Sequence, residues 1–122
     1  MKNYVVIGGS TGIGRALVEQ LSTDHQVWAT YNQTPIESND RVTYHPLDVT
    51  AENMDLSWLP DQIDGLAYCV GSIALKPFHR IKAEEFIQDY QKQTVAAIQI
   101  LQQSLSALKA SDQASVVLFS TV

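Results

Sequence analysis

The glycines near the amino terminus could hold an anionic group against the backbone. Gly8 permits a tight turn with an unusual φ, and Gly12 lets the backbone approach a bound phosphate with no Cβ in the way. Gly14 lets a following helix pack closely, and the free N–H groups at the start of that helix favour a pyrophosphate. Hydroxyls within the turn can add hydrogen bonds to phosphate. The whole turn reads Gly8, Gly9, Ser10, Thr11, Gly12, Ile13 and Gly14.

The spacing of these glycines separates the turn from two other phosphate-binding loops. The loop of nucleoside triphosphatases needs Gly, four residues, and then Gly-Lys-Ser/Thr, whereas Gly14 is followed here by Arg15 and Ala16. The dinucleotide fingerprint G-x-G-x-x-G also fails, because the spacing here is G-x-x-x-G-x-G. A glycine-rich turn without any ligand is the remaining alternative. A strand before the turn and a helix after it favour a ligand.

Apolar periodicity predicts that strands and helices alternate along the chain. The predicted strands are Asn3–Ile7, Gln26–Tyr31, Val42–Leu47, Ile63–Val70 and Ala114–Val122. The predicted helices are 13–22 and Lys82–Lys109, and the second pattern allows a break near Gln91. Residues Thr50–Pro60 suit a loop or one short helix. Strands that are apolar almost throughout predict a Rossmann-type α/β fold, a doubly wound parallel sheet of order 3-2-1-4-5.

The length of 122 residues suffices for one domain with a core and is too short for two. Residues 1–122 are therefore expected to form one dinucleotide-binding domain. The chain stops inside or directly after an apolar strand, which would leave a hydrophobic edge unpaired. We accordingly expect the domain to be truncated after its fifth strand.

Composition narrows the classes of partner. A net charge of -5 with scattered Lys and Arg argues against a nucleic acid or a membrane surface. The amino terminus lacks a signal peptide, and no apolar stretch approaches the ~20 residues of a membrane span, so a cytoplasmic protein is expected. The single cysteine, Cys69, suits a small core residue. Because His25, His45 and His79 lack metal-ligand spacing, no metal site is expected.

The glycine spacing resembles that of the short-chain dehydrogenase/reductase family, whose first turn reads Thr-Gly-x-x-x-Gly-x-Gly. Ile7 stands where the family usually has Thr. The pair Asp48 and Val49 after the third strand is similar to the family's Asp-Val pair, in which the carboxylate accepts a hydrogen bond from the adenine amino group. Gly71 is kept from the family's Asn-Asn-Ala-Gly, but the three residues before it are Tyr68-Cys69-Val70. The resemblance extends over the whole chain, and only the first turn is specific.

The resemblance implies an NAD(P)-dependent oxidoreductase that moves a hydride between nicotinamide and a carbonyl or alcohol, with this chain as its cofactor-binding half. The alternative is a non-catalytic dinucleotide-binding or interaction module. Tyr68-Cys69-Val70 favours that alternative, as does Gln93, which stands near the position of a family Asn.

The end of the second strand bears on the choice of cofactor. An NAD enzyme usually has Asp or Glu there to bind the ribose 2′-OH, but this chain has Tyr31 and Asn32. With no carboxylate to repel a 2′-phosphate, NADP(H) is favoured over NAD(H). No Arg or Lys stands at this strand end, although Arg15 is not far away in sequence.

The pair of residues that would donate a proton during hydride transfer is missing from the chain. The family uses a Tyr with a Lys four residues later, and none of the five tyrosines here has that partner. The resemblance places the family's substrate-orienting serine at Thr121, with Ser120 beside it, and either hydroxyl could serve. Ordinary polarity of a loop after a strand is the alternative explanation for these two residues. We therefore expect the chain to be inactive alone. A small-molecule substrate belongs to the full-length parent, and the resemblance implies a homo-oligomer formed through the 82–109 helix.

Overall fold

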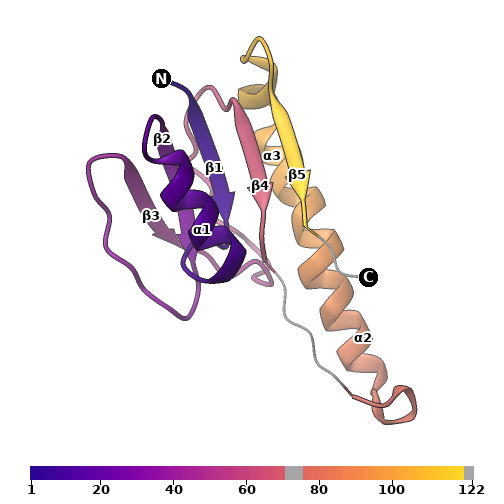
Figure 1. Cartoon of the computed structure of the whole chain (residues 1–122). Coiled ribbons are helices and arrows are strands. Elements are labelled where there is room, and N and C mark those ends of the chain that lie inside the picture. Colours follow the sequence, from indigo (N-terminus) through magenta and orange to yellow (C-terminus); the bar gives the residue numbers. More distant parts are fainter. Residues whose placement is uncertain (71–75, 120–122) are drawn as a thin grey trace.

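The computed structural model describes residues 1–70 and 76–119, and within them five parallel strands form one sheet of order β3-β2-β1-β4-β5 (Figure 1). This order confirms the doubly wound topology predicted from the sequence. The strands are β1 (Asn3–Ile7), β2 (Gln26–Tyr31), β3 (Val42–Pro46), β4 (Gly65–Tyr68) and β5 (Ser115–Leu118). The helical elements are α1 (Gly12–Leu21), η1 (Phe78–Arg80), α2 (Ala83–Tyr90), η2 (Gln91–Val95) and α3 (Ala96–Lys109).

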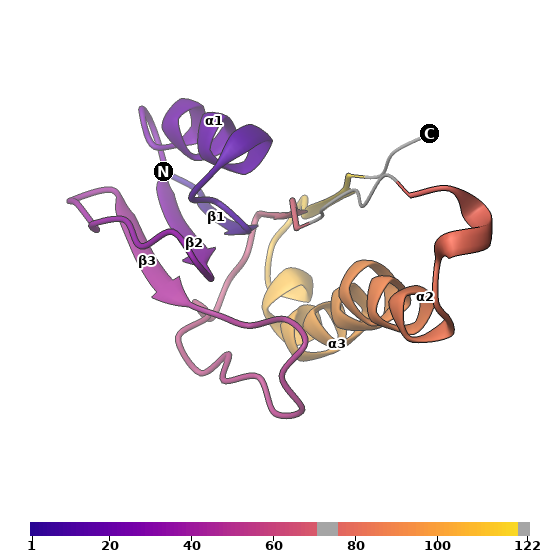
Figure 2. The same ribbon diagram turned by 90° about the horizontal axis from the view of Figure 1, so that it is seen from below.

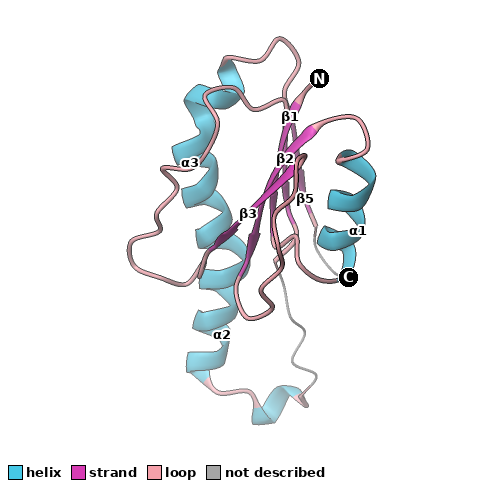
Figure 3. Cartoon of the chain, turned by 90° about the vertical axis from the view of Figure 1, so that its left-hand side faces the viewer, coloured by secondary structure: helices cyan, strands magenta, loops and turns pink. Residues whose placement is uncertain are grey.

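The helices cover opposite faces of the sheet (Figures 2 and 3). On the face of α1, Val6 from β1 packs with Val18 and Val27. On the face of α3, Val5 and Ile7 pack in the cluster that includes four buried helix residues, Ala96, Ala97, Ile100 and Leu108. Successive residues of β1 thus point to opposite faces, and both faces are apolar because both are covered.

The long second helix is divided by a π-helical turn. The predicted 82–109 helix consists of α2, the π-helical segment η2 and α3, so a break does occur near Gln91. A π turn of this kind inserts one residue into the helical repeat and often marks a functional position. Its carbonyl at Lys92 accepts a hydrogen bond from the hydroxyl of Tyr68 in β4. The helix is therefore fixed to strand β4 at its irregular point.

The strands β4 and β3 are both shorter than predicted. β4 spans Gly65–Tyr68 rather than Ile63–Val70, because its pairing with β1 runs only from Gly65 to Tyr68. β3 ends at Pro46 rather than Leu47. The segment Thr50–Pro60 contains turns and no helix.

β5 differs from the other strands because its side chains are exposed. Its partner is β4. The predicted strand Ala114–Val122 is wrong at Ala114 and Phe119, because β5 spans Ser115–Leu118, and residues 120–122 lie outside the described part. The large apolar residues of this region are each 43–53% exposed, and they are Val116, Val117, Leu118 and Phe119. The expectation that every strand is covered on both faces is therefore wrong for β5.

The 82–109 helix also carries exposed apolar residues. They are Phe86, Ile87, Tyr90, Ile98 and Leu105. Their exposure fits the expected apolar stripe, and self-association through this helix stays a prediction. None of the helices in the described ranges is both long and apolar enough to cross a membrane.

The carboxylate of Asp64 joins three segments of the chain through hydrogen bonds. Its lowered pKa predicts that the chain loses stability in acid. Its carboxylate accepts hydrogen bonds from the Asn3 N–H (2.8 Å) and from the hydroxyl of Ser111 (2.7 Å). The Asn3 bond first, and then the Ser111 bond, lower the pKa of this carboxyl. A lowered pKa means that the stabilisation is complete above the unfolded-state value of about 4 and is lost as pH falls through the folded value.

We therefore expect thermal unfolding between pH 7 and pH 3 to show a smaller pH dependence in Asp64→Asn than in the native chain. The substitution should lower the Tm at pH 7, and the difference in Tm between the variant and the native chain should become smaller as the pH falls. Parallel Tm curves for the two proteins would contradict this role for Asp64.

Candidate functional site

The turn between β1 and α1 has the backbone that its glycines predict. Gly8 has φ +84° and Gly12 has φ +57°, both in the left-handed region that favours glycine. A Cβ at Gly14 would lie 1.9 Å from the carbonyl oxygen of Gly8. The close approach at Gly14 is thus to the backbone of Gly8, directly after β1, and any side chain would block it.

Two residues outside the turn hold it in place. The N–H of Gly8 donates to Oγ1 of Thr30 (2.8 Å), and the N–H of Gly9 donates to the carbonyl of Thr30 (2.9 Å). The hydroxyl of Tyr44 in β3 donates to the carbonyl of Gly9 (3.1 Å), and burial raises the pKa of this tyrosine. Thr30 is only 2% exposed. The strand order thus stabilises the turn, because β2 and β3 supply the residues that form hydrogen bonds with it.

The first turn of α1 presents N–H groups rather than a side-chain cap. Thr11 precedes the helix with extended backbone (φ -143°, ψ 161°), and its side chain makes no capping hydrogen bond. No acidic residue occupies the first turn of this helix. Its amino terminus therefore keeps the partial positive charge that attracts an anion.

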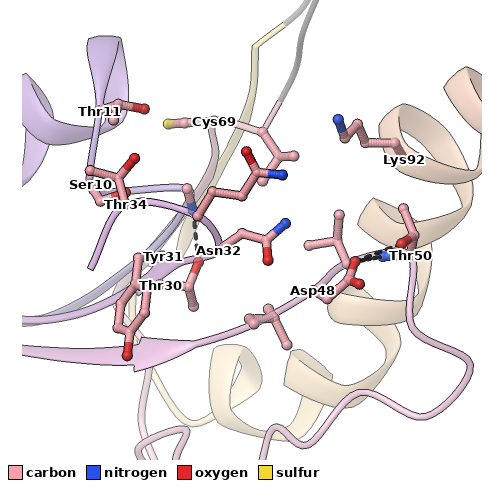
Figure 4. Close-up of a pocket in the computed structure, with 15 residues that line it drawn as sticks. Ser10, Thr11, Thr30, Tyr31, Asn32, Thr34, Asp48, Thr50, Cys69 and Lys92 are labelled. Atoms are coloured by element: carbon pink, nitrogen blue, oxygen red, sulfur yellow. Dashed lines mark hydrogen bonds between the residues drawn. The ribbon is translucent and has the colours of Figure 1, made fainter. Parts of the chain in front are cut away.

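A cavity of about 650 Å³ opens at the carboxyl ends of the strands (Figure 4). Its lining comes from the glycine turn, the segment after β2, the segment after β3, the end of β4 and η2. The lining residues are Gly8, Ser10, Thr11, Thr30, Tyr31, Asn32, Gln33, Thr34, Leu47, Asp48, Val49, Thr50, Cys69, Val70 and Lys92. Ligands of open α/β sheets bind at this edge, where the strand order reverses.

Most of the predicted site residues meet at this cavity. Those that line it are Gly8, Ser10, Thr11, Tyr31, Asn32, Asp48 and Val49. Gly12, Ile13 and Gly14 shape the turn and the start of α1 without lining the cavity, and Ile13 is 62% exposed. The predicted residues Gly71, Ser120 and Thr121 lie outside the described part of the chain.

Asp48 forms hydrogen bonds within a turn and also lines the cavity. Its Oδ1 accepts from the N–H of Thr50 (2.9 Å) and from the hydroxyl of Thr50 (2.6 Å). These bonds, the hydroxyl first, lower the pKa of Asp48, so the group is a carboxylate at neutral pH. The Thr50 bonds orient this carboxylate at the cavity wall, where it can accept a hydrogen bond from a ligand.

Cys69 lies in the cavity wall after β4 and not inside the core, where the sequence predicts it. β4 ends at Tyr68, which is 2% exposed and belongs to the core, and the next two residues enter the cavity wall. Cys69 is half-buried there, at the edge of the core rather than inside it, and burial raises the pKa of its thiol.

The segment after β2 contributes no charged side chain to the cavity lining. The residues that follow one another there are Tyr31, Asn32, Gln33 and Thr34. Arg15 lies elsewhere, on an exposed face of α1, where its Nε is 3.3 Å from Oε1 of Glu19. Among the described lining residues, the cation is Lys92, which the sequence analysis did not single out. Gln93 beside it is exposed, and the described residues contain no cluster of three or more metal-binding side chains.

No protein-family model matches the sequence, and no curated protein matches it. Solved structures do match. A short chain dehydrogenase family protein from Francisella tularensis has a TM-score of 0.80 at 25% identity, covering 95% of this chain and 49% of that chain.

Two further solved structures contain cofactors. A protein from Burkholderia multivorans, described as a short-chain dehydrogenase/reductase with bound NADP, has a TM-score of 0.75 at 16% identity, covering 88% of this chain and 54% of its own. A short chain dehydrogenase from Leptospira borgpetersenii with bound NAD+ has a TM-score of 0.70 at 23% identity, with coverages of 87% and 44%. The chain thus spans about half the length of these proteins. It has the fold of the amino-terminal part of a short-chain dehydrogenase/reductase.

Proposed function

We propose that the chain binds a nicotinamide dinucleotide in the cavity at the carboxyl ends of the strands, as the cofactor-binding half of an NAD(P)-dependent oxidoreductase. The observation that carries the proposal is the glycine turn, which opens into the cavity beside the uncapped amino terminus of α1. A Cβ built at Gly12 would meet nothing within 4 Å, so the backbone there is open to a close ligand. This open backbone suits a pyrophosphate, which needs N–H groups at short range.

The lining residues divide the cavity into regions for the parts of such a cofactor. Ser10 and Thr11 would donate hydroxyl hydrogen bonds to the pyrophosphate. Asp48 would accept a hydrogen bond from the adenine amino group, and Asn32 would lie near the adenosine ribose. A bound reduced nicotinamide would supply the hydride for transfer to a carbonyl in the oxidoreductase of which this chain would be the cofactor-binding half.

We expect NADP(H) to bind more tightly than NAD(H). The support is the neutral segment after β2, in which Tyr31 and Asn32 offer no carboxylate to repel a 2′-phosphate or to hold a ribose 2′-OH. Of the two cofactor-bound matches, one holds NADP and the other NAD+, so the fold accommodates either.

Under this proposal the chain binds the cofactor but does not catalyse hydride transfer by itself. Its sequence has no Tyr four residues before a Lys, and proton donation to a developing alkoxide needs such a positioned group. A dinucleotide-binding module without catalysis is the second candidate function. Tyr68 favours it, because this side chain uses its hydroxyl to hold the helix where the family has Asn.

Calorimetric titration of the 122-residue chain with NADPH and NADH tests the proposal. We expect saturable binding of both cofactors and a lower Kd for NADPH, with a parallel change in Trp28 and Trp58 emission. Heat and emission that stay flat with both cofactors would refute cofactor binding. A carbonyl-reduction assay on the parent oxidoreductase that this proposal implies separates the oxidoreductase from the non-catalytic module.

A further inference from the structure

The carbonyl of Gly9 is held from outside the glycine turn by a residue of β3. The hydroxyl of Tyr44 donates to this carbonyl at 3.1 Å, across β2, which lies between β3 and β1. Tyr44 pairs with Ala29 of β2, and its ring packs against the apolar cluster on the face of α1. Neither Tyr44 nor Gly9 is among the residues that line the cavity. An effect of this hydrogen bond on a ligand must therefore pass through a neighbouring residue.

Gly9 is enclosed by the elements around it. Its N–H donates to the carbonyl of Thr30 at 2.9 Å, so β2 holds one polar group of this glycine and β3 holds the other. A Cβ at Gly9 would lie 2.9 Å from Cγ2 of Val18 and 3.0 Å from Cβ of Ala29. Because α1 and β2 pack this closely, the hydrogen bond from Tyr44 determines the direction of the Gly9 carbonyl.

The direction of the Gly9 carbonyl also fixes the next N–H of the chain. A trans peptide is planar, and its C=O and N–H point in opposite directions. The peptide bonds of the described residues are all trans. The N–H of Ser10 therefore points away from Tyr44. Ser10 lines the cavity beside Thr11 (Figure 4), and its N–H has no backbone acceptor within the described part of the chain.

Burial keeps the hydroxyl of Tyr44 in the form that donates. Loss of contact with solvent raises the pKa of Tyr44, and this effect is larger than those of Arg15, which lowers the pKa, and of Glu19, which raises it. These two charged residues lie on α1 and pair with each other at 3.3 Å. The hydroxyl therefore carries its proton at neutral pH and stays a donor to the Gly9 carbonyl.

We infer that Tyr44 is a positioning residue for the dinucleotide, because its hydrogen bond to the Gly9 carbonyl directs the N–H of Ser10 toward the pyrophosphate. The inference rests on the proposed function and adds to it a residue of β3 that does not touch the ligand. An N–H that already faces a phosphate oxygen loses little freedom on binding, so it holds the anion more tightly. Without the Tyr44 hydroxyl the Gly9–Ser10 peptide can rotate, and the N–H faces the phosphate for only part of the time.

Calorimetry on Tyr44→Phe and on the native chain tests this role. NADPH, NADH and adenosine diphosphate ribose contain the pyrophosphate, whereas adenosine contains no phosphate. We expect Tyr44→Phe to bind the pyrophosphate ligands roughly fivefold more weakly, as for the net loss of one hydrogen bond, and to bind adenosine as the native chain does. A merely structural role would lower the stability and leave the ratio of the adenosine diphosphate ribose and adenosine affinities unchanged.

The amide of Ser10 gives a second readout. Its signal in a proton–nitrogen correlation spectrum should shift when adenosine diphosphate ribose binds the native chain, stay in place with adenosine, and shift less in Tyr44→Phe. Phenylalanine keeps the ring in the cluster beside α1, so this variant should still unfold cooperatively in urea. Tyr90→Phe is the matched control, since it removes the hydroxyl of an exposed tyrosine of α2 and should change neither the affinities nor the Ser10 signal.

Other results would overturn the inference. Equal losses for adenosine and for the pyrophosphate ligands would mean that Tyr44 supports the shape of the whole site. A loss confined to NADPH would place the Ser10 N–H on the 2′-phosphate, and unchanged affinities would leave the hydrogen bond without a part in binding. A Ser10 signal that does not move with adenosine diphosphate ribose would remove this N–H from the site. Failure of the native chain to bind either NADPH or NADH is a different result, since it refutes the proposed function itself.

Discussion

Replacing Gly14 with alanine is expected to lower the free energy of unfolding by roughly 3 kcal/mol and to abolish dinucleotide binding, since a clash with rigid backbone atoms belongs at the upper end of the usual cost of overpacking. The added Cβ would lie 1.9 Å from the Gly8 carbonyl oxygen, 2.8 Å from the Gly8 carbonyl carbon and 3.1 Å from the Gly9 Cα. These are backbone atoms, so no side-chain rotation relieves the clash. The turn must open, and the N–H groups of α1 must move away from the pyrophosphate.

Urea unfolding followed by tryptophan emission measures the loss, and calorimetry with NADPH measures the binding. Gly12→Ala is the matched control, because its Cβ would meet nothing within 4 Å. Its cost comes from φ +57°, and an L residue there loses only about 1–2 kcal/mol. A Gly14→Ala protein as stable as Gly12→Ala would contradict the packing role of Gly14.

The sheet and the glycine turn could be predicted because their signals are local. A continuous apolar run such as Asn3–Ile7 indicates a strand covered on both faces, and the structure gives Val6 to one face and Val5 to the other. Gly8 and Gly12 indicate positive φ because other residues are strained there. Each of these inferences depends on residues close together in the chain.

The opposite side of the cavity could not be predicted, because its residues come together only in the folded chain. Lys92 stands on an amphipathic helix, where a lysine is usually a solvated surface residue. Its place at the cavity depends on the π turn and on the hydrogen bond from Tyr68. The pattern allowed a break near Gln91, but it predicted neither a π turn nor the bond to Tyr68. Cys69 was predicted in the core since it lies in an apolar run, but β4 ends one residue before it.

Thr30 was missed for a different reason. A buried threonine in a strand is ordinary, since β-branched residues are common there. The register gives the useful signal: Val6 pairs with Ala29, so Thr30 comes level with the start of the glycine turn. A hydroxyl at that position can accept from the turn, as Oγ1 does from the N–H of Gly8.

Thr30→Val is therefore expected to destabilise the chain by about 1–3 kcal/mol, the cost of leaving a part-buried N–H without its acceptor. Valine keeps the shape and removes the Oγ1 that accepts from Gly8, while the Thr30 carbonyl still accepts from Gly9. Because Gly8 then loses its restraint, the affinity for NADPH should fall roughly tenfold, equivalent to about 1.4 kcal/mol.

The same urea and calorimetric measurements test Thr30→Val against two controls. Thr30→Ser keeps the hydroxyl and should retain most of the affinity. Thr43→Val makes the same chemical change at an exposed position of β3 and should alter neither quantity. If Thr30→Val bound NADPH as tightly as Thr30→Ser, the hydrogen bond to Gly8 would have no part in shaping the site. Selective weakening in Thr30→Val would show that β2 positions the turn for its ligand.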